Sequence, residues 1–101
     1  MNTKEISIDW NGGKQIVIMK RLTFGEMNQL TEEATDIKVI NGQPIVKVSQ
    51  KVLKELGILK SIVSAPFTID LQSIQGLEAE VGNILFEEFS DLNQQGQKKN
   101  N

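Results

Sequence analysis

Apolar and polar residues alternate near the N-terminus in a pattern that predicts a β-hairpin. Apolar side chains recur at every second position from Ile6 to Trp10, which is the period of a strand with one buried face. Asn11-Gly12 follows, and this dipeptide favours a two-residue hairpin turn because both residues tolerate positive φ. A second strand is expected from Lys14 to Leu22. Its centre is apolar on both faces, so one face should pack on helices and the other should be covered by helices or by a partner.

A helix is predicted from Phe24 to about Ala34. Thr23 and Glu26 have the spacing of a capping box, in which each side chain accepts a hydrogen bond from the other residue's backbone N–H. The residues at helical spacing are expected to face the core: Phe24, Met27, Leu30, Thr31 and Ala34.

The stretch from Ile37 to Val48 is again strand-like. β-Branched residues alternate with lysines on both sides of an Asn41-Gly42 turn. Pro44 has no N–H to donate, so a strand here belongs at a sheet edge. The pattern suits either a second small hairpin or a long extended loop.

A second helix is expected to begin after Ser49, which can cap it, and to continue to about Ser64, before Pro66. Its apolar residues cover more than one stripe, which predicts the central helix of the core. Asp70 and Gly76 should bracket a short helical turn.

The last helix is predicted over about Glu78 to Leu92. Its apolar face is formed by the following residues: Val81, Leu85, Glu88 or Phe89, and Leu92. The remaining residues, 93–101, include no side chain that could bury apolar area, so we expect a disordered polar tail. Residues 1–92 should form a single α+β domain, in which an N-terminal β-hairpin precedes a small helical domain with a second extended or hairpin segment.

The amino-acid composition excludes several classes of functional site. The chain of 101 residues has no His and no Cys, which excludes disulfides, thiolate and imidazole nucleophilic systems and most zinc sites. The net charge of −2 gives no general attraction to nucleic acid or to anionic membranes. No catalytic, cofactor-binding or metal-binding residue is predicted, and we do not expect an enzyme. No signal peptide or membrane-spanning run is visible, which favours a cytoplasmic protein.

Apolar residues expected at the surface are the candidate partner-binding residues. Val39, Ile40, Ile45 and Val46 surround the second turn, and Phe86 lies opposite the apolar stripe of the last helix. A cluster of such residues marks a partner surface, whereas cover by the same chain is the alternative. The free edge of the second hairpin could also pair with a second copy by strand addition.

Three features resemble the tail assembly chaperones of long-tailed bacteriophages and prophages. The first is the heptapeptide Lys20-Arg21-Leu22-Thr23-Phe24-Gly25-Glu26 after a short hairpin. The others are an apolar second helix ending at Ala65-Pro66-Phe67 and a final helix starting with Leu77-x-x-x-Val81. The likeness extends from about Glu5 to Leu92 and includes no catalytic signature.

The resemblance implies a small protein of the host cytoplasm that takes part in tail assembly and is absent from the finished virion. Members of the family are thought to bind the tape measure protein, keep its apolar helices in solution and help to recruit tail tube protein. Many are also made in a longer, frameshifted form. The alternatives are a structural virion protein, such as a tail completion or connector subunit, and, with less support from the charge, a small nucleic-acid-binding regulator.

Overall fold

The computed structural model describes residues 3–98, and the side chains of residues 3–94, as an α+β fold with two separate sheets. One sheet has the strand order β1-β2-β5, formed by β1 (Thr3–Trp10), β2 (Gly13–Lys20) and β5 (Ile62–Ser64). The other is a two-stranded hairpin of β3 (Thr35–Ile40) and β4 (Gln43–Val48). The helices are α1 (Phe24–Ala34), α2 (Gln50–Ser61), α3 (Leu71–Gln75) and α4 (Ala79–Lys98). The predicted α+β class with an N-terminal hairpin is confirmed, and the second segment, left open between an extended loop and a hairpin, is a hairpin.

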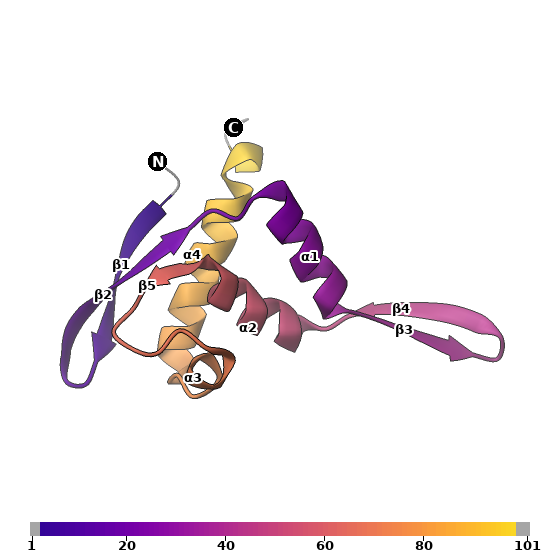
Figure 1. The fold of residues 1–101 in the computed structure, drawn as a ribbon, viewed down its shortest axis with the longest axis horizontal. Coiled ribbons are helices and arrows are strands. Elements are labelled where there is room, and N and C mark those ends of the chain that lie inside the picture. The colour runs from indigo at the N-terminus through magenta and orange to yellow at the C-terminus, as the bar shows by residue number, and fades with distance from the viewer. Residues whose placement is uncertain (1–2, 99–101) are drawn as a thin grey trace.

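The β3–β4 hairpin, called the arm below, projects from a body formed by all the other elements (Figure 1). The molecule therefore measures 54 × 36 × 22 Å. Its radius of gyration is 15.4 Å, whereas a compact chain of this length has about 13 Å.

The core lies where the three-stranded sheet meets α2 and α4. Inward residues of the N-terminal hairpin are fully or almost fully buried, and β2 places Val17 and Met19 at 0% exposure. The outer face of β2 is only partly covered, because Ile16 is 48% exposed. The helical contribution to the core comes from these buried residues: Leu30, Ile58, Ile74, Val81, Leu85, Phe89 and Leu92. Phe89, and not Glu88, thus completes the buried face of the last helix.

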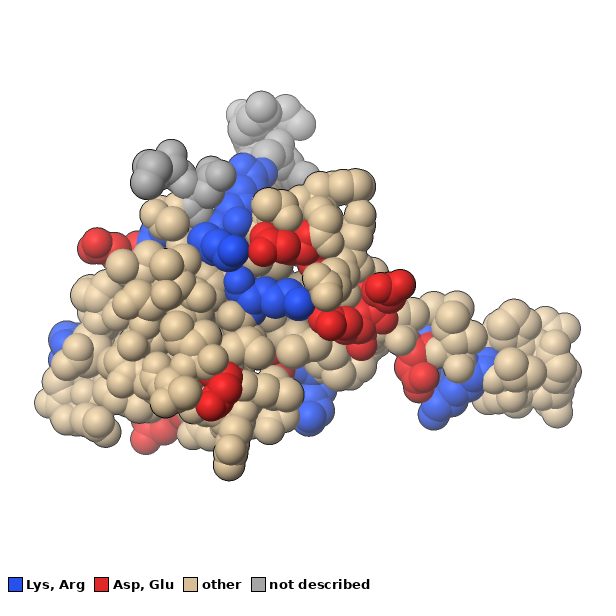
Figure 2. Space-filling model, viewed as in Figure 1, with Lys and Arg blue, Asp and Glu red and all other residues tan. Residues whose placement is uncertain are grey.

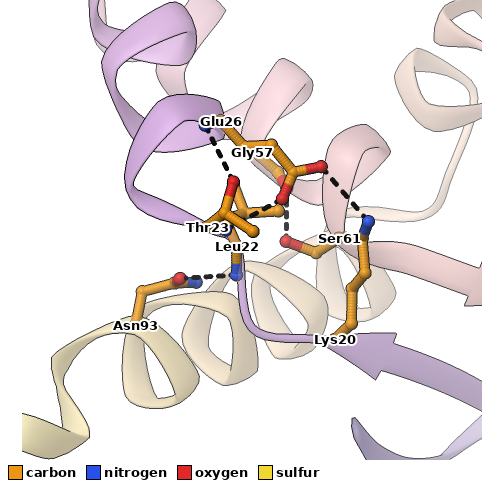
Figure 3. Close-up of polar contacts among 7 residues, drawn as sticks. All are labelled: Lys20, Leu22, Thr23, Glu26, Gly57, Ser61 and Asn93. Carbon is orange, nitrogen blue, oxygen red and sulfur yellow. Dashed lines mark hydrogen bonds and ion pairs between the residues drawn. The ribbon is translucent and has the colours of Figure 1, made fainter. Parts of the chain in front are cut away.

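The capping box at the start of α1 is present as predicted (Figure 3). Thr23 Oγ1 accepts from the Glu26 N–H over 3.1 Å, and Glu26 Oε1 accepts from the Thr23 N–H over 2.8 Å. The hydrogen bond from the Thr23 N–H is the main cause of the lowered pKa of Glu26. The second cause is Lys20, whose Nζ donates to Glu26 Oε2 over 3.2 Å. Phe24, however, is 83% exposed and does not face the core as expected. It lies six positions, and so about 120° around the helix, from the fully buried Leu30.

The second helix ends earlier than predicted. α2 stops at Ser61, whose hydroxyl donates to the Gly57 carbonyl over 2.8 Å, and the next three residues form β5 instead of a last helical turn. The free edge of β2 accepts this segment, pairing Met19 with Ile62. β-Branched Ile62 and Val63 suit the extended conformation, so strand pairing replaces the final turn.

The polar tail expected from Asn93 is instead helical through Lys98, and residues 99–101 lie outside the described residues. Asn93 docks on the body, because its Oδ1 accepts from the Leu22 N–H over 3.0 Å (Figure 3). Its Nδ2 donates to the Phe89 carbonyl over 2.8 Å. Leu22 lies between β2 and α1, where its N–H has no ladder or helical partner of its own. Asn93, the first residue past the predicted end of the last helix, is therefore held by hydrogen bonds of its side chain.

α2 and α4 approach each other closely at Gly57. A Cβ placed there would lie 2.9 Å from Cε2 and Cζ of the Phe89 ring, and that ring is itself only 5% exposed. Gly82, in α4, has no atom within 4 Å of an added Cβ. The first glycine is therefore a packing requirement and the second is not.

We expect Gly57→Ala to lower the free energy of unfolding by about 1 kcal/mol, because overpacking costs about 1–3 kcal/mol and outweighs the better helix propensity of alanine. The matched control Gly82→Ala should raise it by about 0.5–1 kcal/mol. Urea unfolding monitored by circular dichroism measures both. Equal stabilisation by the two substitutions would show that Phe89 does not constrain α2.

Asn93→Ala should lower the free energy of unfolding by about 1–3 kcal/mol, because it leaves the N–H of nearly buried Leu22 without an acceptor. Asn93→Asp keeps the acceptor and should retain more stability than the alanine variant. Exposed Gln94 provides the control, as Gln94→Ala should change stability by less than about 0.5 kcal/mol. Thermal and urea unfolding that ranked the two alanine variants equally would contradict the docking role.

Candidate partner-binding surface

The arm presents two chemically different faces. Directly opposite residues of an antiparallel pair lie on the same face. The register pairs Thr35 with Val48, Ile37 with Val46, and Val39 with Pro44. These pairs form one face, called the apolar face below: Thr35, Ile37, Val39, Pro44, Val46 and Val48. The opposite face carries two lysines, an aspartate and a glutamine beside two isoleucines: Asp36, Lys38, Ile40, Gln43, Ile45 and Lys47.

Nothing in residues 3–94 covers the apolar face. Val39 is 72% exposed, Ile37 63%, Val46 62% and Val48 48%. Every residue of β4, and every residue of β3 after Thr35, is exposed. A two-stranded hairpin without a third layer is at best marginally stable in water, so this face lacks the cover that such side chains normally obtain.

The arm leaves and re-enters the body at one point. The Ser49 N–H donates to the Ala34 carbonyl over 2.7 Å, which joins the end of α1 to the residue that caps α2. At the other end, Asn41 and Gly42 form the predicted turn with φ values of 54° and 75°. The arm is therefore a closed extension whose removal would leave the two helix ends adjacent.

The tip of the arm carries no charged side chain, unlike the part nearer the body. Residues 39–46 include no charged side chain, whereas Asp36, Lys38 and Lys47 lie closer to the base. Figure 2 shows this division, with red and blue side chains near the body and an uncharged tip. Glu32 and Glu33 at the end of α1 add acidic side chains beside the base, where Glu33 Oε1 lies 3.3 Å from Lys60 Nζ.

The structure divides the predicted partner-binding residues among three places. Val39 and Val46 share the apolar face, whereas Ile40 and Ile45, at 50% and 38% exposure, lie on the opposite face. Phe86 belongs to the body, where it is partly buried and its ring centre lies 5.9 Å from that of Phe89. The Lys54 ammonium lies 5.4 Å from the centre of the Phe86 ring. Phe86 is thus a packing residue with a partly exposed ring and does not extend the arm surface.

Two shallow grooves adjoin Phe86. A groove of about 290 Å³ lies between α2, α3 and α4, with both charged and apolar walls. A second, of about 330 Å³, has a mainly apolar wall of Met27, Leu53, Phe86 and Phe89 between α1, α2 and α4. Neither contains a group of three or more acidic side chains suited to a metal ion, and no such group occurs among residues 3–98.

Sequence reasoning missed Ile37, Pro44 and Val48 as members of the apolar face. The signal that could have found them is the Asn41-Gly42 turn, because a two-residue loop fixes which residues are opposite each other and therefore which share a face. Phe24, 83% exposed on α1, was expected in the core but is a surface residue, because it lies about 120° around the helix from buried Leu30.

Comparison with known proteins finds no matching family model, no matching curated protein and no matching solved structure. In the described part of the chain, no helix combines the length and apolar character needed to cross a membrane.

Replacing residues 37–46 with Asn-Gly should leave the melting temperature of the body unchanged. The shortened hairpin would close on the Asp36–Lys47 pair, and none of the buried core residues belongs to the arm. Thermal unfolding and the near-ultraviolet signal of Trp10, which packs 5.2 Å from the Phe67 ring, measure the body alone. A marked loss of stability would mean that the arm supports the core.

Proposed function

We propose that this protein is a tail assembly chaperone of a long-tailed phage or prophage that acts in the host cytoplasm by non-covalent binding. The observation that carries the proposal is the uncovered apolar face of the arm. The resemblance of residues 5–92 to that family supports it, whereas the absence of His and Cys is neutral to it. On this proposal the client is the tape measure protein, with tail tube protein recruited afterwards.

The apolar face suits a client with long apolar helices. Ile37, Val39 and Val46 present β-branched side chains on one face of the arm, so a helix laid across them would bury apolar area on both partners. The body has its own core, and binding would therefore need no refolding of the chaperone. The overall charge of −2 helps to keep the complex dissolved.

An exposed arm would also suit a structural subunit that inserts it into a neighbouring subunit of the tail. The two functions differ in where the protein is found after assembly. A structural subunit remains in purified particles, whereas an assembly chaperone is absent from them. Mass spectrometry of purified virions separates the two.

Val39→Thr with Val46→Thr should weaken client binding by roughly tenfold or more, because each hydroxyl would be buried without a partner. Threonine keeps the strand preference of valine, so the arm should stay folded. The readouts are the soluble fraction of co-expressed tape measure protein and the dissociation constant for that protein. The matched control, Ile40→Thr with Ile45→Thr on the opposite face, should change neither. A loss confined to the control pair, or no loss in either, would contradict binding through the apolar face.

A further inference from the structure

The hydrogen-bonding pattern of the arm shows which backbone groups point outward. In an antiparallel ladder, hydrogen-bonded and non-hydrogen-bonded pairs alternate. The Ser49–Ala34 bond continues the register of the arm, so counting outward makes 36/47, 38/45 and 40/43 the hydrogen-bonded pairs. The backbone groups of 35, 37 and 39 therefore point away from β4, and those of 44, 46 and 48 point away from β3.

The two outer edges of the arm differ in their capacity to accept another strand. On the β4 edge, Pro44 stands at an outward position and has no N–H to offer. On the β3 edge, Ile37 and Val39 keep both outward groups, and only the Thr35 N–H is occupied, by the Glu32 carbonyl at the end of α1. Residues 36–40 are all exposed, so the β3 edge is open and the β4 edge is blunted.

We propose that the β3 edge pairs with the β3 edge of a second copy of this chain, antiparallel and centred on Ile37. Ile37 would exchange both of its outward hydrogen bonds with Ile37 of the second copy. The Val39 N–H would donate to the Thr35 carbonyl of the second copy. The Thr35 N–H stays bonded to the Glu32 carbonyl, so this pair would make one hydrogen bond instead of two. The result is a four-stranded sheet with the order β4-β3-β3-β4 across a two-fold axis.

Charge complementarity favours a second copy as the occupant and selects the register. Asp36 and Lys38 flank Ile37 on the more polar face. Centring on Ile37 places each Asp36 opposite Lys38 of the second copy, and both such pairs are attractive. A shift of two residues in the pairing would place Asp36 opposite Asp36 or Lys38 opposite Lys38, which is repulsive. The segment Asp36-Ile37-Lys38 is therefore self-complementary in the antiparallel direction.

The pairing uses backbone groups and leaves the apolar face free. Directly opposite residues share a face, so the apolar faces of both arms would lie on the same side of the joined sheet. The dimer would thus present one continuous apolar surface twice as wide as that of a single arm. The inference does not depend on the proposed function, because it concerns the protein without its client.

Ile37→Pro and Val46→Pro provide a matched pair. These residues are opposite each other on the apolar face, and each has an outward N–H, one on each edge of the arm. Proline is tolerated where the N–H points outward, so both arms should still form. Analytical ultracentrifugation of the wild-type chain should show a mass twice the 11.3 kDa of the monomer. Ile37→Pro should return it to the monomer, whereas Val46→Pro should remain dimeric.

Cysteine cross-linking tests the register, since the native chain has no Cys. Asp36→Cys and Lys38→Cys proteins, mixed and oxidised, should form the mixed disulfide dimer. This pair is a non-hydrogen-bonded one, with Cα atoms about 4.5 Å apart, which suits a disulfide. Each variant oxidised alone should cross-link far less.

A wild-type chain that is monomeric at all concentrations would overturn the proposal, as would a dimer that survives Ile37→Pro. If both proline variants are monomeric, the cross-linking decides. Preferential mixed disulfide formation supports the β3 edge in this register, and equal or absent cross-linking rules it out.

Discussion

The missing side chain at Gly57 lets the Phe89 ring lie against the backbone of α2, and this contact bears on the positions of β5 and of the base of the arm. At its C-terminal end, α2 passes directly into β5, which completes the sheet beside β2. At its N-terminal end, α2 begins after Ser49, the residue bonded to Ala34 at the end of α1. The depth at which α2 sits on α4 therefore sets the third strand of the sheet and also the base of the arm.

Elements specified by local chemistry could be predicted from the sequence. The Thr23–Glu26 capping box needs only residues three apart, and α1 has the predicted bounds of Phe24 and Ala34. Both Asn-Gly turns need only positive φ at adjacent residues, and both hairpins form around them. Asp70 caps α3 for the same reason, since its carboxylate accepts from the Ser73 N–H over 2.8 Å and its pKa is lowered by that bond.

Features that depend on distant parts of the chain could not be predicted. β5 exists because β2 offers a free edge more than 40 residues earlier in the sequence, and helical periodicity in 62–64 gave no sign of it. From the sequence, Asn93 is expected to be a polar tail residue. Only the folded structure brings it to Leu22, 71 positions away, whose N–H donates to its Oδ1. The candidate surface shows the same limit. The Asn41-Gly42 turn fixes the register of the arm, but only the folded body shows that none of residues 3–94 covers its apolar face.

The arm is closed at its base by the Ser49–Ala34 hydrogen bond and does not pack in the core. Its amino-acid composition therefore reflects requirements other than core packing. In the arm, side chains and backbone groups form two separate surfaces. The apolar face offers side chains, which can bury area against a client without using the backbone. The β3 edge offers the backbone of Ile37 and Val39, which can join another strand without covering the apolar face. Because the two surfaces share no groups, the proposed pairing of two arms and the proposed binding of a client would not compete, and joining the arms would widen the surface that a long helix could contact.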